Sequence, residues 1–348
     1  MVTGTVTVTV PVTMPVPRGK VMIEPDIETM ESSKAYKKKL REQILRLKKE
    51  RNAYIVAHNY QNYEVQEIAD ILGDSLALSK ATIGSGHDMI VFCGVDFMAE
   101  SSKILNPEKT VILPVREADC PMALMVTAER LREKKKQYPD AAVVCYVNSS
   151  AEVKAESDIA CTSSNAVQVV KSLPHKQVLF VPDKNLGHYV QRFCPEKEIV
   201  LWQGFCTTHI RITAEEVRRV KEKFPGAPFI VHPECPPDVI DLAEHVCSTS
   251  GFAPFIAKSD AQTFIIGTEV GMIYALKKQF PDKRFIAPTE HFVCQTMKMT
   301  TLGWVAHALE HLEHQIEVPE PVRQRAERAL RRMMDLTLDH PNAVIASY

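Results

Sequence analysis

The feature that most constrains this chain is an internal repeat of about 87 residues, which occurs three times. The copies open with the segments YIVAHNYQNYEVQEIADILGDS, VVCYVNSSAEVKAESDIACTSS and FIVHPECPPDVIDLAEHVCSTS. Equivalent cysteines at 120, 206 and 294 lie 86 and 88 positions apart, and prolines at 107, 195 and 281 lie 88 and 86 apart. Because several sets of residues keep the same period, the repeat defines the architecture of the chain.

Each copy alternates short apolar strands with amphipathic helices, a pattern that predicts parallel sheets covered by helices. We expect three homologous three-layer α/β domains around a pseudo-threefold axis, over residues 25–119, 120–205 and 206–302. C-terminal helices at 303–348 are expected to complete the first domain. Residues 1–24, rich in Val, Thr and Pro, are expected to be a disordered or loosely ordered extension. Ligands of α/β folds bind beyond the carboxyl ends of the strands, so one central site is expected.

Composition excludes several classes of protein. The 348 residues are 45% hydrophobic and 24% charged, as in folded globular proteins. With 42 basic and 43 acidic residues, no basic excess points to nucleic acid. No apolar run reaches the roughly 18–20 residues of a membrane helix. Nine cysteines without a secretory signal indicate free or metal-bound thiols, so we expect a cytoplasmic protein with neither nucleic-acid nor membrane partners.

The equivalent cysteines Cys120, Cys206 and Cys294 would form a trigonal set of thiol ligands on the threefold axis. Thiolates favour zinc, copper(I) or iron–sulfur clusters. A [4Fe–4S] cluster normally takes four cysteines, so three would leave one iron open to substrate. Such an iron is a Lewis acid that helps a hydroxyl group to leave.

Polar residues follow the first strand of each copy and are expected to converge on the same site. They are His58, Tyr146, Asn148, His232 and Glu234. This set is suited to proton transfer and to holding an anion with several acidic groups. Glu234 is the best candidate for a general base, since it is the one carboxylate among the residues of these three turns.

Small hydroxyl residues form the third equivalent set, Ser75, Ser163 and Thr249. Each precedes an expected helix, where hydroxyl and backbone N–H groups bind carboxylate or phosphate. His209 follows Cys206 by three residues and is expected to face the same site.

The chain resembles the quinolinate synthase family over about residues 36–335. The resemblance rests on long segments: AHNYQ, GDSLALSKAT, FCGVDFMAESSKILNP, YVNSSAEVKAESDIACTSSNA, PDKNLG, WQGFC, HPEC, STSG, IIGTEVGM and MKM. It implies the condensation of iminoaspartate with dihydroxyacetone phosphate to quinolinate, phosphate and water in de novo NAD biosynthesis. It also implies three similar α/β domains and transient contact with an enzyme that produces iminoaspartate.

The resemblance further implies roles for individual residues. Cys120, Cys206 and Cys294 would hold a [4Fe–4S] cluster whose open iron assists dehydration. Proton transfer would fall to Glu234, Tyr60, Tyr146 and His209. Substrate would be bound by His58, Ser75, Tyr146, Asn148, Ser163, His232, Glu234 and Thr249.

The chain departs from the family pattern beside two ligands. Gln295 and Thr296 replace the usual Pro-Asn after Cys294, which we expect to loosen that loop, and Asp119 replaces the usual Gly before Cys120. Three other functions stay open at this point. They are a cluster-dependent dehydratase of another polycarboxylate, a non-catalytic iron or redox sensor, and a zinc-bound structural protein.

Overall fold

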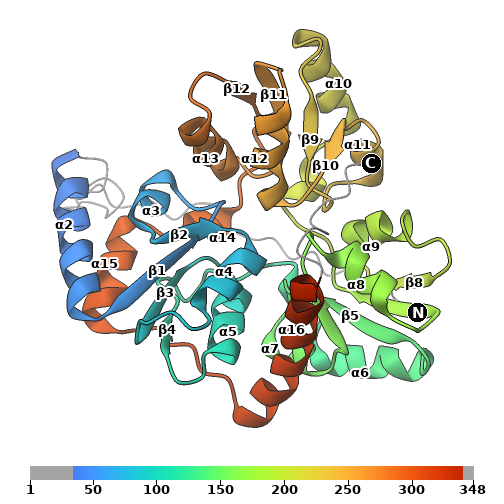
Figure 1. Ribbon diagram of the computed structural model, residues 1–348, viewed down its shortest axis with the longest axis horizontal. Coiled ribbons are helices and arrows are strands. Elements are labelled where there is room, and N and C mark those ends of the chain that lie inside the picture. The colour runs from blue at the N-terminus through green and yellow to red at the C-terminus, as the bar shows by residue number, and fades with distance from the viewer. Residues whose placement is uncertain (1–33, 340–348) are drawn as a thin grey trace, which may run out of the picture.

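Three parallel four-stranded sheets form the frame of the protein (Figure 1). The computed structural model describes residues 34–339, so the predicted extension at 1–24 lies outside the described residues. The sheets have the strand orders β2-β1-β3-β4, β6-β5-β7-β8 and β10-β9-β11-β12, which are the same order repeated. The expected α/β fold of three similar parallel-sheet units is therefore confirmed.

Four helices alternate with four strands in the same order in each unit. The first unit contains α2 (Lys34–Glu50), β1 (Ala53–His58), α3 (Tyr63–Ile68), β2 (Ile71–Gly73), α4 (Ser75–Thr82), β3 (Met89–Cys93), α5 (Asp96–Leu105) and β4 (Thr110–Ile112). The second contains η1 (Ala123–Met125), α6 (Ala128–Gln137), β5 (Ala142–Tyr146), α7 (Ala151–Ala155), β6 (Ile159–Cys161), α8 (Ala166–Ser172), β7 (Gln177–Val181), α9 (Lys184–Gln191) and β8 (Glu198–Leu201). The third contains η2 (His209–Arg211), α10 (Ala214–Lys223), β9 (Phe229–Val231), α11 (Pro237–Ile240), β10 (His245–Val246), α12 (Thr249–Lys258), β11 (Thr263–Gly267), α13 (Gly271–Gln279), β12 (Arg284–Ile286) and α14 (Gln295–Lys298). The second and third units thus also contain the short helices η1, η2 and α14.

The central strands of each sheet are buried on both faces. Every residue of β3 and of β5 is buried, and both are nearly continuous apolar runs. Such runs are typical of parallel strands that carry helices on both faces. Since all strands of a sheet run the same way, their carboxyl ends share one edge, and the loops that follow them leave from that edge.

The strands β2, β6 and β10 were not recognised in the sequence, which showed only a hydroxyl-rich segment after the first helix of each copy. They have two or three residues each, too few for a periodic pattern. Each pairs with the first strand of its unit, as in the register of Val144 with Ile159. They therefore bring the hydroxyl residues that follow them to the same edge as the loops of β1, β5 and β9.

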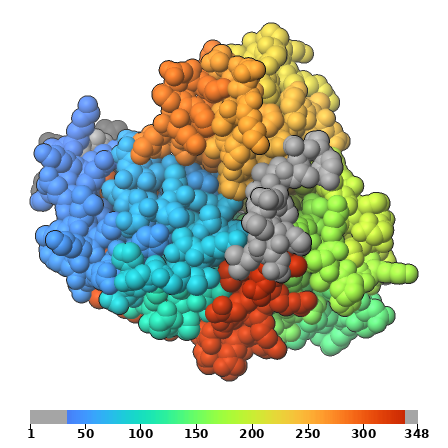
Figure 2. Space-filling view, viewed as in Figure 1, coloured from blue at the N-terminus to red at the C-terminus, as the bar shows by residue number. Residues whose placement is uncertain are grey.

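The C-terminal helices α15 (Leu302–His311) and α16 (Glu320–Asp339) pack on different units. Val305 and Leu309 of α15 share a hydrophobic core with α2 and the first sheet. The buried stripe of α16, which includes Ala326, Leu330 and Met333, lies mainly along α7 and β6 of the second unit. On the face shown in Figure 2, α16 lies between the first and second units. Of the C-terminal residues expected to complete the first unit, those of α15 pack on its sheet.

No helix within residues 34–339 combines the length and the apolar character that a membrane span requires.

The loop before Cys206 approaches the end of β7 very closely at Gly204. A Cβ atom at Gly204 would lie 2.6 Å from the Pro182 carbonyl oxygen, well inside van der Waals contact. We predict that Gly204→Ala lowers the free energy of unfolding by about 1–3 kcal/mol, because backbone must move to admit the methyl group. Urea denaturation measures this loss. The control is Gly86→Ala, since a Cβ at Gly86 would meet no atom within 4 Å; equal stability of the two variants would contradict the prediction.

Candidate active site

The carboxyl ends of the three sheets face one central cavity, which has about 680 Å³ of empty space when its open mouth is included. Every residue singled out from the sequence lines this cavity. These residues are His58, Tyr60, Ser75, Cys120, Tyr146, Asn148, Ser163, Cys206, His209, His232, Glu234, Thr249 and Cys294. The repeat therefore brings together side chains that are more than 230 positions apart in the sequence.

Equivalent elements place these side chains. His58 ends β1, Tyr146 ends β5, and His232 directly follows β9. Ser75 and Thr249 are the first residues of α4 and α12, so their hydroxyl groups lie beside exposed backbone N–H groups of helix N-termini. The three cysteines lie on the loops that follow the fourth strand of each sheet.

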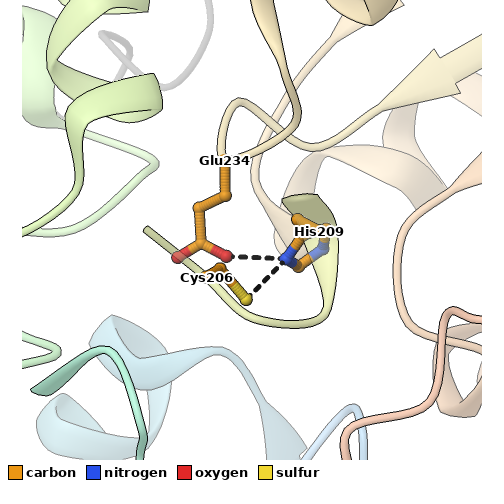
Figure 3. Close-up of side chains that lie close together, drawn as sticks. All are labelled: Cys206, His209 and Glu234. Atoms are coloured by element: carbon orange, nitrogen blue, oxygen red, sulfur yellow. Dashed lines mark hydrogen bonds and ion pairs between the residues drawn. The ribbon is translucent and has the colours of Figure 1, made fainter. Parts of the chain in front are cut away.

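Glu234 is the centre of a buried hydrogen-bonding network (Figure 3). Its Oε2 lies 2.8 Å from Nδ1 of His209. The same oxygen lies 3.5 Å from Nδ1 of His232. Burial raises the pKa of Glu234, but His232, His209 and the Tyr146 hydroxyl group outweigh burial and hold the pKa at about 2. Its Oε1 is buried and has no hydrogen-bond partner among the described residues. Glu234 is therefore an ionised carboxylate with one oxygen free to accept a proton.

His58 and His232 are neutral hydrogen-bond donors. Burial lowers the pKa of each imidazole to about 3. In both, Nδ1 accepts the backbone N–H of the residue two positions later, Tyr60 at 3.2 Å and Glu234 at 3.3 Å. This leaves the proton on Nε2, which in His232 lies 3.2 Å from the Ser163 hydroxyl group.

A chain of hydrogen bonds links Tyr60 to Glu234. The Tyr60 hydroxyl group lies 2.6 Å from Oγ1 of Thr268, and this atom lies 2.9 Å from Nε2 of His209. His209 in turn contacts Glu234 through Nδ1. Burial raises the pKa of Tyr60 and of Tyr146 well above the ordinary value, so both phenols keep their protons at neutral pH. Thr268 was not singled out from the sequence, because nothing in its neighbourhood marks it as polar and buried.

The three equivalent cysteines differ from the other six, since they are half-buried at the cavity while the others are buried. Burial raises the pKa of the Cys120 and Cys206 thiols, and nearby Cys294 raises both further. The sulfurs therefore lie close enough for their charges to interact. A metal centre would stabilise the three thiolates by offsetting the repulsion between their charges. Three soft sulfur ligands around one cavity fit an iron–sulfur cluster.

A second grouping of metal-binding atoms exists in the same cavity. Atoms of Cys206, His209 and Glu234 lie within 4.8 Å of one another, and Sγ of Cys206 is 3.1 Å from Nδ1 of His209 (Figure 3). A sulfur, nitrogen and oxygen set is typical of zinc. However, Nδ1 of His209 is already engaged with the Glu234 carboxylate. The sulfurs of Cys206 and Cys294 contact only the neutral groups of His209, at 3.1 Å, and Thr296, at 3.6 Å, among the hydrogen bonds of the described residues.

The loop of Cys294 is held firmly in spite of its missing proline. The Cys294 N–H donates to Oε1 of Glu269 at 3.2 Å, and Lys298 at the end of α14 lies 3.0 Å from the same oxygen. Lys298 also donates to the Tyr60 carbonyl group of the first unit. Glu269 therefore fastens both ends of the segment that we expected to be loose.

Hydrogen bonds between units surround the cavity. Oε2 of Glu100 on α5 accepts the N–H of Ala151 in the second unit at 2.9 Å. Nδ2 of Asn185 on α9 donates to the Glu234 carbonyl group of the third unit at 2.9 Å. Together with the bond from Lys298 to the first unit, these contacts join the three units next to the loops that carry the site.

Sequence reasoning missed several other residues of the cavity wall. The polar ones are Thr208, Glu269 and Thr296, and the apolar ones are Val95, Phe97, Met98, Met122 and Met297; Asp74 and Thr162 also line the cavity. Asp74 and Thr162 adjoin hydroxyl residues that were singled out, so the repeat alignment pointed to their neighbourhood. Among the described residues that line the cavity, none is Lys or Arg.

Comparisons with known proteins agree over nearly the whole described chain. A family model described as "Quinolinate synthetase A protein" matches residues 42–335. "Quinolinate synthase" of Methanoregula boonei is 54% identical over 297 residues, which cover 85% of this chain and 98% of that protein. "Quinolinate synthase" of Geobacter sp. strain M21 is 53% identical over 300 residues, or 86% and 98% of the two chains. "Quinolinate synthase 2" of Methanosarcina acetivorans is 51% identical over 296 residues, or 85% and 95%.

The neutral state of His58 gives a pH dependence of stability. The folded chain keeps this imidazole unprotonated down to about pH 3, whereas the unfolded chain protonates it below about pH 6.5. Since the unfolded state binds more protons in this window, the free energy of unfolding decreases as the pH falls from 6.5 toward 3. We predict that His58→Gln reduces this slope by up to about 1.4 kcal/mol per pH unit.

Urea denaturation at pH 7, 6 and 5 measures the slope. His175→Gln is the control, since His175 is exposed and this variant should keep the slope of the unmodified chain. Equal slopes in the His58 variant and in the control would contradict the prediction.

Proposed function

Since this chain belongs to the quinolinate synthetase A family, we propose that it is an enzyme that synthesises quinolinate for de novo NAD biosynthesis. Its substrates would be iminoaspartate and dihydroxyacetone phosphate, and its products quinolinate, phosphate and two waters. The observation that carries the proposal is the meeting of three equivalent cysteines with the buried Glu234 network in one cavity. Each part of this cavity matches a requirement of the reaction.

The cavity binds anions through neutral donors. Two carboxylates and a phosphate would meet the Nε2–H groups of His58 and His232, the Asn148 amide, and hydroxyl groups at the N-termini of α4 and α12. Since no Lys or Arg belongs to the described wall, helix N-termini and these donors supply the positive potential.

Proton transfer would fall to Glu234 and the residues connected to it. The free Oε1 of Glu234 accepts a proton from substrate carbon or nitrogen, and its low pKa keeps it ionised beforehand. His209 and Thr268 connect this carboxylate to the Tyr60 hydroxyl group, which donates a proton at the other end of the chain. Tyr146 provides a second protonated phenol in the cavity.

Cys120, Cys206 and Cys294 would hold a [4Fe–4S] cluster. When bound, the cluster supplies a Lewis acid for the loss of hydroxyl, because three protein ligands leave one iron open. A cytoplasmic location is supported by nine free thiols, and we class the enzyme as a transferase. Because imines hydrolyse in water, we also propose transient contact with the enzyme that produces iminoaspartate, and no nucleic-acid or membrane partner.

Removing one ligand tests the cluster. We predict that Cys206→Ala abolishes quinolinate formation and removes most of the bound iron and sulfide, because two thiols do not retain the cluster. Anaerobically purified protein is assayed with dihydroxyacetone phosphate and with iminoaspartate generated in the cuvette, alongside metal analysis. Cys194→Ala is the control, since Cys194 is buried away from the cavity. Activity without bound iron would refute the open-iron chemistry, and zinc in place of iron would favour a zinc-bound protein.

Removing the base tests the proton-transfer role. We predict that Glu234→Gln keeps the iron and sulfide content but lowers the rate of quinolinate formation by at least about 100-fold. The control is Glu222→Gln on α10, where the carboxylate is exposed. A nearly normal rate in the Glu234 variant would remove Glu234 from this role. Unmodified protein with a full cluster and no product would instead favour another dehydratase or a sensor.

A further inference from the structure

A carboxylate stands beside each of the three ligand cysteines. These residues are Asp96, Asp183 and Glu269, which have no place in the motifs recognised from the sequence. Each lies where the third strand of its unit leads into the next helix, so all three occupy equivalent places in the repeat.

In the first unit, Asp96 holds the cysteine loop with two hydrogen bonds. Its Oδ1 accepts the backbone N–H of Cys120 at 3.0 Å. Its own backbone N–H donates to the Ala118 carbonyl group, also at 3.0 Å. The loop is therefore fastened at the ligand itself and two residues before it.

The third unit repeats this arrangement with a longer side chain. Oε1 of Glu269 accepts the Cys294 N–H at 3.2 Å, and the adjacent Val270 N–H donates to the Phe292 carbonyl group at 2.9 Å. Phe292 precedes Cys294 by two residues, as Ala118 precedes Cys120. Glu269 is completely buried and is paired with Lys298, which stabilises its negative charge.

In the second unit, Asp183 is completely buried at the start of α9. Its Oδ1 accepts two N–H groups of this helix, and the next backbone N–H donates to the Gly204 carbonyl group at 2.9 Å, two residues before Cys206. The Cys206 N–H also interacts with the Asp183 carboxylate. Oδ2 of Asp183 has no hydrogen-bond partner among the described residues, so capping α9 does not occupy both carboxylate oxygens.

We propose that Asp96, Asp183 and Glu269 are positioning residues that orient the three ligand cysteines and keep the reduction potential of the bound cluster low. This inference rests on the proposed function, because it concerns the cluster that the cysteines hold. Partners behind metal ligands fix ligand orientation and tune the metal. Peptide N–H groups that donate to cysteine sulfur raise the reduction potential of a cluster. A carboxylate that accepts such an N–H group prevents it from donating to the sulfur, so the reduction potential stays lower.

The consequence for the reaction is a cluster that keeps one oxidation state. The dehydration needs a Lewis acid and no net electron transfer, since substrates and products balance without an oxidant or reductant. A carboxylate charge beside a ligand cysteine disfavours the addition of an electron. If these carboxylates were only helix caps, replacing them would change the stability of the protein alone. In the proposed role, replacing them also changes the reduction potential of the cluster.

The first test is Glu269→Gln in the full-length protein carrying its cluster. The amide has the same shape and can still accept the Cys294 N–H, but the charge is lost. We expect the iron and sulfide content to stay unchanged. We expect the ratio of reduced to oxidised cluster at a given potential to rise about tenfold, which corresponds to a reduction potential about 59 mV higher for one electron. A redox titration followed by electron paramagnetic resonance measures this. Glu290→Gln, an exposed acid four residues before Cys294, is the matched control and should not shift.

The second test uses Asp96, which is only half-buried, so its variants should fold even if those of Glu269 do not. Asp96→Asn should raise the potential in the same direction. Asp96→Ala, which also removes the acceptor of the Cys120 N–H, should lose iron to a chelator about 10–100-fold faster. Potentials and iron retention equal to those of the unmodified protein would overturn the inference.

The outcomes separate this inference from the proposed function. Unmodified protein that takes up no iron–sulfur cluster would overturn both. A cluster with normal turnover, whose potential does not respond to these variants, would overturn the positioning role alone.

Discussion

Parallel strand pairing is the constraint on which the rest of this structure depends. In a parallel sheet all carboxyl ends lie on one edge, so every loop that follows a strand leaves from that edge. Three such sheets face a common centre, and their loops enclose one cavity. The site is therefore built from twelve strands but from a single local pattern, repeated three times.

Polar groups buried at this centre require partners, because an unpaired buried charge is costly. Glu234 obtains one from His209, and Glu269 obtains them from Lys298 and the Cys294 N–H. These pairs also join loops that belong to different parts of the chain. The interactions that stabilise these buried charges thus also hold the side chains of the site in position. Glu234 stays ionised as a result.

Much of the site could be predicted because the repeat transfers information between copies. His58, Tyr146 and His232 share one place in the repeat, and so do the three cysteines, so their convergence followed from arithmetic and the parallel-sheet rule. The carboxylates beside the cysteines were missed, since each contacts a residue 23 to 25 positions later through the backbone. Thr268 was missed for the same reason, as its partners Tyr60 and His209 are 208 and 59 positions away.

The sequence by itself determined the threefold α/β architecture, the equivalent cysteine, histidine, tyrosine and hydroxyl residues at the cavity and, through its segments, the family. Periodicity and spacing are properties of the chain that need no coordinates to read. Only the tertiary structure decided which atoms meet: that Glu234 bonds His209, that α16 covers the second unit, and that carboxylates hold the cysteine loops. These contacts join residues that are apart in the sequence, and the packing geometry that brings them together leaves no periodic signal in the sequence.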